Sequence, residues 1–384
     1  MIIYDTTGLY NILVVDETSE ACRKGLITEE ELVKIKQAHP SPFYTPNIFV
    51  RAGFFLLTCI ISSFSAGLLS LIFLDSNMIS GYAWLLFLGL ANYAALELST
   101  KRNRYYRAGV DDALIWISGS LIAGTFMLIA EGNNTLISGF IFLLSLMFTL
   151  RFTDRLTAVV AYLAALACIF FSWQKMGDFG LLSIPFVLMA VSAATYVFSK
   201  RVEGLPAGRY YKSCLKAVQL VSLLTLYLSA NYYVVKELGD MLSGEVSDTI
   251  PFAWFFWLWT IAIPFVYIAW GVRNKDLLLI RTGLLLITLA VFTFRNYYHM
   301  LPVELAFTIG GIVVLAVTWF LIKYLHTPKA GFTSVQADRS KEDDELNVES
   351  LIVSETFSDV GTHDDGGTTF GGGRFGGGGS SSDF

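Results

Sequence analysis

The chain has 384 residues, of which 54% are hydrophobic and only 15% are charged, and its formal net charge is −5. Soluble globular proteins carry about 25% charged residues, so this composition argues against an ordinary soluble enzyme and for a membrane protein. Phe, Tyr and Trp make up 15% of the chain, which suits lipid-facing surfaces and interfacial belts. The net charge indicates little about partners, because the acidic residues concentrate in the C-terminal tail.

Residues 1–50 predict a small cytoplasmic segment of two short helices. The first covers about Leu9 to Arg23 and closes at Gly25. The second begins at Thr28-Glu29-Glu30-Glu31, a capping box in which Thr28 and Glu31 satisfy each other's backbone N–H groups, and a proline-rich run ends it. The helices pack on each other, or they form a simple amphipathic anchor on the membrane surface. Without a cleavable signal pattern, the first apolar span is expected to act as the insertion signal.

Ten apolar stretches follow, each about long enough to cross a bilayer. We place them near 52–74, 79–98, 110–131, 135–150, 156–173, 179–199, 214–235, 252–272, 276–294 and 301–323. The fourth is the shortest and can gain length from Asn133 and Asn134. The sequence therefore predicts an all-α polytopic membrane protein of about ten transmembrane helices, with nine or eleven left open.

Lys and Arg fall almost entirely on alternate loops. Those after the even-numbered spans hold Lys101, Arg102, Arg104, Arg107, Arg151, Arg155, Lys200, Arg201, Arg209, Lys212, Arg273, Lys275, Lys323 and Lys329. The opposite loops hold only Lys175, Lys236 and Arg295. By the positive-inside rule both termini of this multi-pass protein are cytoplasmic.

The composition changes again after residue 326. We expect residues 327–384 to form a disordered tail, first acidic and then glycine-rich, because it cannot bury enough apolar surface to offset its ordering entropy. The three expected parts are thus the segment 1–50, the membrane domain 51–326 and this tail.

A weak internal repeat accompanies the spans. Arg104-Tyr105-Tyr106-Arg107 precedes the third span, and Arg209-Tyr210-Tyr211-Lys212 precedes the seventh. These offsets suggest that spans one to four and five to eight are direct repeats, whereas a five-plus-five division would give the inverted repeats of many transporters. Basic residues and tyrosines are also expected at every cytoplasmic edge, which produces part of this periodicity.

Ionisable groups inside a bilayer are functional candidates. Glu97, Asp111, Asp112 and Arg281 form the candidate intramembrane polar site. The aspartate pair can bind a cation or relay protons, but acids in a first helical turn are also favoured by the helix dipole. Glu97 can pair with Arg281 across helices or with Lys101 one turn later.

A second candidate cluster lies at the last outward loop. It consists of Arg295, His299 and Glu304. This cluster can bind an anion or sense pH through His299, and it can equally be a polar and aromatic girdle at the membrane interface.

Motifs for other chemistry are missing from the sequence. There is no GxxxxGK[ST], no HExxH and no Cys/His cluster, so we expect no catalytic residues, no metal site, no cofactor and no nucleic-acid partner. The four cysteines match neither a zinc site nor a disulfide framework.

The layout resembles uncharacterised bacterial polytopic membrane proteins of the domain-of-unknown-function type. In these, a short cytoplasmic segment often carries a Gly-Leu-Ile-[Ser/Thr] turn into an acidic helix, which here reads Gly25-Leu26-Ile27-Thr28-Glu29. The glycine-rich end of the chain, through Phe384, is similar to tails on several bacterial membrane proteins, including ones with a TPM domain. The resemblance supplies no substrate.

Two functions follow as expectations. The first is an inner-membrane protein that moves a small solute or lipid, motivated by mid-span prolines, the repeat and sparse intramembrane charge. The alternative is a membrane scaffold that recruits protein partners through its N-terminal segment and its tail. An integral membrane enzyme acting on lipid is a weaker third.

Overall fold

The computed structural model describes residues 2–23, 25–72, 81–244, 250–297 and 303–325. The chain divides into two units, 1–334 and 335–384. The tail expected at 327–384 lies outside the described residues. In the described residues the only regular elements are helices, which confirms the all-α class.

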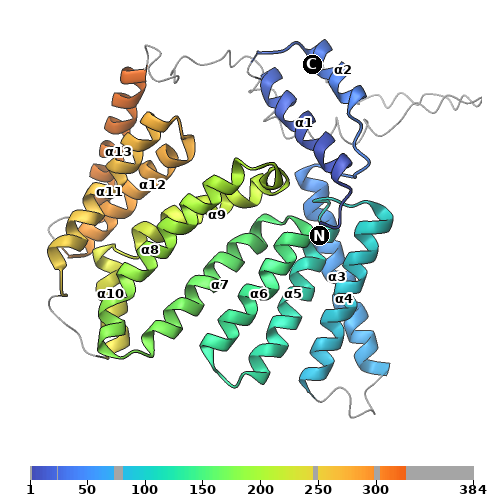
Figure 1. Cartoon of the computed structure of the whole chain (residues 1–384), viewed down its shortest axis with the longest axis horizontal. Helices are drawn as coiled ribbons and strands as arrows, with labels where there is room; N and C mark the ends of the chain where they lie inside the picture. Colours follow the sequence, from blue (N-terminus) through green and yellow to red (C-terminus); the bar gives the residue numbers. More distant parts are fainter. Residues whose placement is uncertain (1, 24, 73–80, 245–249, 298–302, 326–384) are drawn as a thin grey trace, which may run out of the picture. The chain divides into compact units, whose positions relative to one another are not determined.

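The N-terminal segment contains the two expected helices, α1 (Thr6–Arg23) and α2 (Glu29–Ala38) (Figure 1). The capping box at the start of α2 is confirmed, since Thr28 Oγ1 accepts from Glu31 N at 3.3 Å and Thr28 N donates to Glu31 Oε2 at 2.9 Å. Gly25 closes α1 with a φ of +68°, a conformation that favours glycine. The two helices pack on one another, and Asn11 Nδ2 donates to Pro40 O at 2.8 Å between them.

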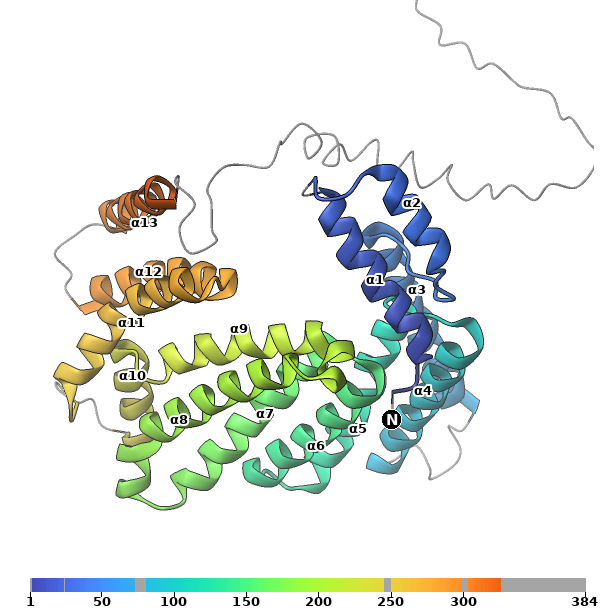
Figure 2. The same ribbon diagram turned by 45° about the horizontal axis from the view of Figure 1, so that its top comes forward.

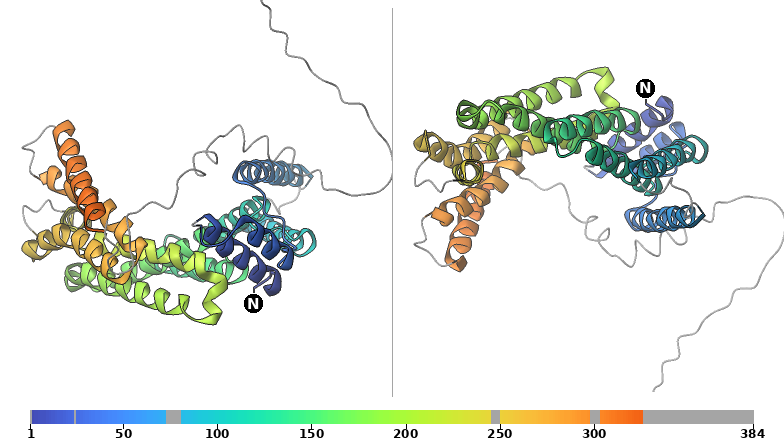
Figure 3. Two further views of the ribbon diagram at one scale, coloured as in Figure 1. Left: turned by 90° about the horizontal axis from the view of Figure 1, so that it is seen from above. Right: turned by 90° about the horizontal axis from the view of Figure 1, so that it is seen from below.

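Eight helices in the described residues are long and apolar enough to cross a membrane. They are α3 (Ile48–Ile72), α4 (Tyr82–Asn103), α5 (Val110–Ile129), α6 (Asn134–Phe152), α7 (Arg155–Gln174), α8 (Asp178–Glu203), α11 (Ala253–Asn274) and α12 (Leu277–Tyr297). The fourth predicted span gains Asn134, where α6 begins, and Asn133 caps this helix by accepting from Leu136 N at 3.3 Å. The last predicted span corresponds to α13 (Val303–Leu325), which packs against α12 (Figure 3) and whose described apolar stretch is the shorter Gly310–Phe320.

The seventh predicted span is not one helix, contrary to expectation. Residues 214–235 are divided between α9 (Lys212–Leu228) and α10 (Tyr232–Ser243), whose axes differ by 72° (Figure 2). Counting this bent pair as one span gives up to nine spans in the described residues.

The membrane helices pack most closely as consecutive hairpins: α4 with α5, α6 with α7, α8 with α9, and α11 with α12. Each hairpin closes at the end where the basic residues lie. In two of them the turn is a left-handed residue followed by a capping aspartate, Thr153-Asp154 and Lys275-Asp276. Asp154 Oδ2 accepts from Thr157 N at 2.8 Å, and Asp276 Oδ1 accepts from Leu278 N at 3.1 Å. These caps fix where α7 and α12 begin.

The N-terminal segment docks on this basic end of the bundle through both repeated tyrosine motifs. Tyr4 packs edge-on against Tyr106, with ring centroids 5.0 Å apart, and Tyr210 from the short 3₁₀ helix η1 (Pro206–Tyr211) joins the same apolar cluster. Arg107 Nη2 also donates to Ser213 Oγ at 2.6 Å, which links the two motif regions directly. The four-span repeat itself stays a prediction, although α5 packs on α3 and α4 as α9 packs on α7 and α8.

Candidate functional site

Glu97 is held in a local ion-pair network near the basic end of α4. Its Oε1 accepts from Arg151 Nε of α6 and from the Tyr93 hydroxyl at 2.9 Å, while Lys101 Nζ lies 3.2 Å from Oε2. The predicted pairing with Lys101 is therefore confirmed. The partner across helices is Arg151, and Arg281 does not take this role. A carboxylate shared by two cations and a phenol is well satisfied where it is.

Asp111 and Asp112 organise the start of α5. The Asp111 side chain is almost fully buried, and its two oxygens accept from Arg107 N at 2.6 Å and Ala108 N at 2.8 Å. Asp112 Oδ2 forms an ion pair with Arg51 Nε of α3 at 2.7 Å. Asp111 thus satisfies backbone groups just before α5, and Asp112 compensates a cation of α3. These local partners favour a structural role at the helix start over a cation or proton site.

Arg281 lies apart from these acids, in a charged cavity at the basic end of α12. The structure therefore does not gather the four candidate residues into one site. Of the outward cluster, Arg295 ends α12, whereas His299 and the side chain of Glu304 lie outside the described residues.

Buried polar side chains surround the break between α9 and α10. Asn231 caps α10, since its Oδ1 accepts from Tyr233 N at 3.0 Å and Val234 N at 3.3 Å. The Asn231 Nδ2 donates to Thr293 Oγ1 of α12 at 3.0 Å. Tyr232 N donates to Thr260 Oγ1 of α11 at 3.0 Å.

These contacts explain why a chain can leave the helical path here. Backbone groups freed inside a membrane must be satisfied by protein, since lipid offers no partners. Thr260 accepts directly from a backbone N–H at the break, and Thr293 holds the side chain of Asn231, which in turn accepts from two further backbone N–H groups. Both threonines are nearly fully buried. Broken helices of this kind are frequent at transporter binding sites.

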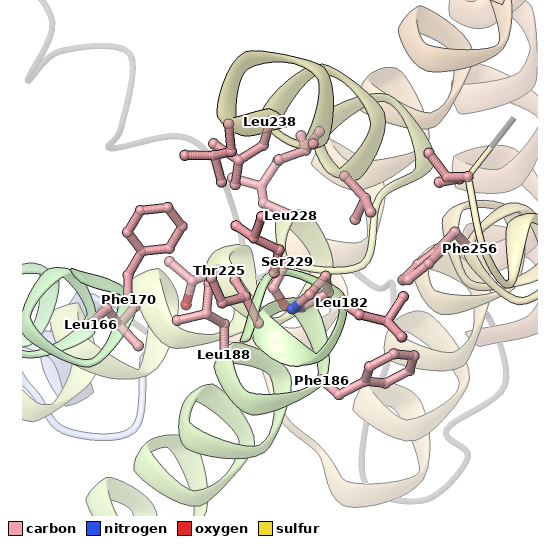
Figure 4. Close-up of a pocket in the computed structure, with 18 of the residues that line it drawn as sticks. Leu166, Phe170, Leu182, Phe186, Leu188, Thr225, Leu228, Ser229, Leu238 and Phe256 are labelled. Atoms are coloured by element: carbon pink, nitrogen blue, oxygen red, sulfur yellow. The ribbon is translucent and has the colours of Figure 1, made fainter. Parts of the chain in front are cut away.

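An apolar pocket of about 620 Å³ lies beside the break, at the opposite end of the bundle from the basic loops. Figure 4 shows leucines and phenylalanines facing one another from several helices, among them Leu166 of α7, Phe186 of α8 and Leu238 of α10. Such a volume and lining suit a hydrophobic ligand better than an ion.

Two of the three hydroxyl side chains that line this pocket belong to one hydrogen-bonded cluster. Ser192 of α8 and Thr225 of α9 both line the pocket, and their oxygens lie 3.1 Å apart. The Tyr162 hydroxyl of α7 contacts both, donating to Ser192 Oγ at 3.0 Å. The cluster joins three helices and gives an apolar pocket one polar point.

Sequence reasoning missed this site because no Gly or Pro marks the break. The sequence feature that could have indicated a new helix start is Ser229-Ala230-Asn231, because Asn231 is a good N-cap residue inside an otherwise apolar run. The pocket itself is built from ordinary core residue types, so the sequence could not distinguish it from packing.

Among the described residues, no group of three or more His, Cys, Asp or Glu side chains is placed to hold a metal ion. No family model, no curated protein and no solved structure matches the chain. We therefore infer the function from the geometry of the two cavities and of the broken helix.

Proposed function

We propose that this chain is a multi-pass protein of a bacterial inner membrane that binds a lipid by its acyl chain in the pocket beside the α9–α10 break and moves it across the bilayer. The bundle has about ten spans, with both termini in the cytoplasm. In this proposal the chain belongs with the bacterial membrane proteins of domain-of-unknown-function type that its N-terminal segment resembles.

The observation that carries the proposal is the coincidence of pocket and break. Ser229 lies in the break and also lines the pocket, so a ligand in the pocket touches the segment whose helical path is interrupted. The break is held by hydrogen bonds to side chains of α11 and α12, so it can rearrange by exchanging these partners. Bending a continuous helix would instead break its backbone hydrogen bonds. The mid-helix Pro185 of α8 lines the same pocket and removes a further helical hydrogen bond.

A lipid is favoured over a small ionic solute for two reasons. The pocket is lined almost entirely by apolar side chains, which would not offset the cost of dehydrating an ion. The acids that could couple an ion gradient, Glu97, Asp111 and Asp112, are engaged in local pairs or helix caps.

The scaffold alternative has one observation in its favour. The N-terminal helices form a docked hairpin at the basic end, and α2 has no buried residue, so its surface is open to a partner. A scaffold would tolerate loss of the apolar pocket.

The test measures lipid movement in liposomes that contain the purified protein and a fluorescent phospholipid. Dithionite added outside quenches only the probe in the outer leaflet, so the rate of further quenching reports how fast the inner-leaflet probe crosses the bilayer. Leu238→Trp fills the pocket from α10 and should reduce the protein-dependent rate by about tenfold, because the larger ring takes space from the acyl chain and a loss of about 1.4 kcal/mol in binding is a tenfold change. Leu258→Trp is the matched control, since Leu258 is 58% exposed on α11 and does not line the pocket. Equal rates for the two folded variants, or no protein-dependent rate, would overturn the proposal.

A further inference from the structure

The charged cavity at the basic end of the bundle has a volume of about 1160 Å³ and is separate from the apolar pocket. Helices α1, α9 and α12 contribute to its wall, together with the ends of α7 and α8. Eight basic and five acidic side chains line it. An excess of positive charge in a concave surface concentrates anions from solution.

Most of the acidic side chains there are already engaged. Glu17 pairs with Lys212 at 2.8 Å, and Asp276 pairs with Lys200 at 2.5 Å. Glu203 accepts from Gln219 Nε2 at 2.8 Å. Two of these acids compensate Lys212 and Lys200, and the excess of eight cations over five acids leaves the cavity with a net positive charge.

Asp16 of α1 faces the same cavity without neutralising it. Burial raises the pKa of the Asp16 carboxyl above its ordinary value, although the charges of Arg107 and Arg155 act in the opposite direction. Asp16 takes part in none of the ion pairs found in the described part of the chain. The Asp16 carboxylate therefore interacts with these arginines only through long-range electrostatics, without an ion pair.

Five lining cations enter none of the side-chain ion pairs or hydrogen bonds found among the described residues: Arg155, Arg209, Lys216, Lys275 and Arg281. Arg209 lies over the ring of Tyr10, and Lys275 lies in the turn before α12. The other three, Arg155, Lys216 and Arg281, belong to the first turns of three helices. Arg155 is the first residue of α7, and Lys216 and Arg281 each lie about one turn into α9 and α12. Helix α9 packs against both α7 and α12, which brings the three cations to one cavity. All three helices start at this end, so the positive ends of their dipoles reinforce the side-chain charges.

We propose that Arg155, Lys216 and Arg281 bind the phosphate group of an anionic ligand, either a phospholipid headgroup or a soluble phosphate. A phosphate offers several oxygens and matches the planar donor pairs of two guanidinium groups, while the lysine adds a point charge. This site is independent of the apolar pocket, because the two cavities share no lining residue.

The experiment measures ligand binding to the full chain in phosphatidylcholine nanodiscs. In one arm, inorganic phosphate is titrated at constant ionic strength against chloride, with intrinsic tryptophan fluorescence as the readout. In the other arm, phosphatidylglycerol replaces part of the phosphatidylcholine, and native mass spectrometry counts the retained lipid. Binding in the first arm identifies a soluble phosphate as ligand, and binding in the second arm alone identifies a lipid headgroup.

Arg281→Gln and Lys216→Gln should each weaken the observed binding by about tenfold, because each removes one charge-assisted contact. Arg273→Gln is the matched control, since Arg273 ends α11 at the same end of the bundle but does not line the cavity. Unchanged thermal unfolding without ligand verifies that each variant is folded. No binding in either arm, or equal weakening by Arg273→Gln, would overturn the proposal.

Discussion

The side-chain amide of Asn231 lies 3.0 Å from the hydroxyl of Thr293 and joins the start of α10 to the C-terminal part of α12. The same amide group donates to the Tyr227 hydroxyl at 3.1 Å, while its oxygen caps two backbone N–H groups. One buried side chain thus caps the backbone at the start of α10 and also hydrogen-bonds to the neighbouring helix α12. The geometry of the break depends on this residue.

Asn231→Ala should lower the free energy of unfolding by about 2 kcal/mol, from a lost cap of about 1 kcal/mol and interhelical bonds worth about 0.6 kcal/mol each in membrane proteins. Ser120→Ala is a suitable control, because Ser120 is exposed and bonds only to its own helix. The measurement is unfolding in detergent followed by circular dichroism. A loss no larger than that of the control would mean that the break does not depend on Asn231.

Glu97→Gln separates a structural role from an ion-coupling role. We expect a loss of about 1 kcal/mol in stability, because the pair with Arg151 is only partly buried. We also expect an unchanged lipid-movement rate at every pH tested. Glu237→Gln, at an exposed position of α10, controls for the removal of a carboxylate. If the folded Glu97→Gln protein lost its transport rate, Glu97 would have to be restored as a functional residue.

The contrast between Glu97 and Asn231 shows what the sequence could predict. Hydropathy and helix signals identified the eight described helices that are long and apolar enough to cross a membrane, because each lies in a continuous apolar run bounded by polar or basic residues, but they did not show that the seventh predicted span is broken. The partner of Glu97 could be predicted only within its own helix, as Lys101. The pairing with Arg151 depends on how α4 and α6 pack, and the break at Asn231 depends on threonines from helices far along the chain. Contacts between residues that are far apart in the sequence leave almost no pattern in the sequence near either residue.

Gly109 is a position where any side chain should disrupt the fold. Its φ is +93°, and a Cβ there would lie 2.1 Å from the carbonyl oxygen of Arg51 in α3. Gly109→Ala should therefore cost about 3 kcal/mol or more, from backbone strain and displacement of α3. Gly119→Ala on the same helix meets nothing within 4 Å and should be near neutral. The comparison is made by thermal unfolding in one detergent, and similar costs for the two variants would contradict the close α3–α5 contact.

The proposed orientation can be measured with single cysteines and a membrane-impermeant maleimide in intact cells. Lys175→Cys should be labelled from outside, because Lys175 lies at the end of the bundle opposite the basic loops. Lys275→Cys should be labelled only after the membrane is permeabilised, since the positive-inside rule keeps basic loops in the cytoplasm. Native Cys22 of α1 should behave like Lys275→Cys. The reverse labelling pattern would invert the topology.

Asp276 should make the stability of the α11–α12 hairpin depend on pH in the acid range. Burial opposes ionisation of this carboxyl, but the ion pair with Lys200 and the backbone donors of α12 outweigh it and lower its pKa below the ordinary value. A lowered folded-state pKa means that the stabilisation is fully present above the unfolded pKa, about 3.9, and is lost as the pH falls through the folded value.

Asp276→Asn should therefore be less stable than the parent protein at neutral pH and should lose less stability between about pH 4 and lower values. Glu17→Gln, which removes the more exposed pair with Lys212, should change stability little, and denaturant unfolding across pH without phosphate compares the two. An Asp276→Asn protein with the same acid dependence as the parent would show that another group controls it.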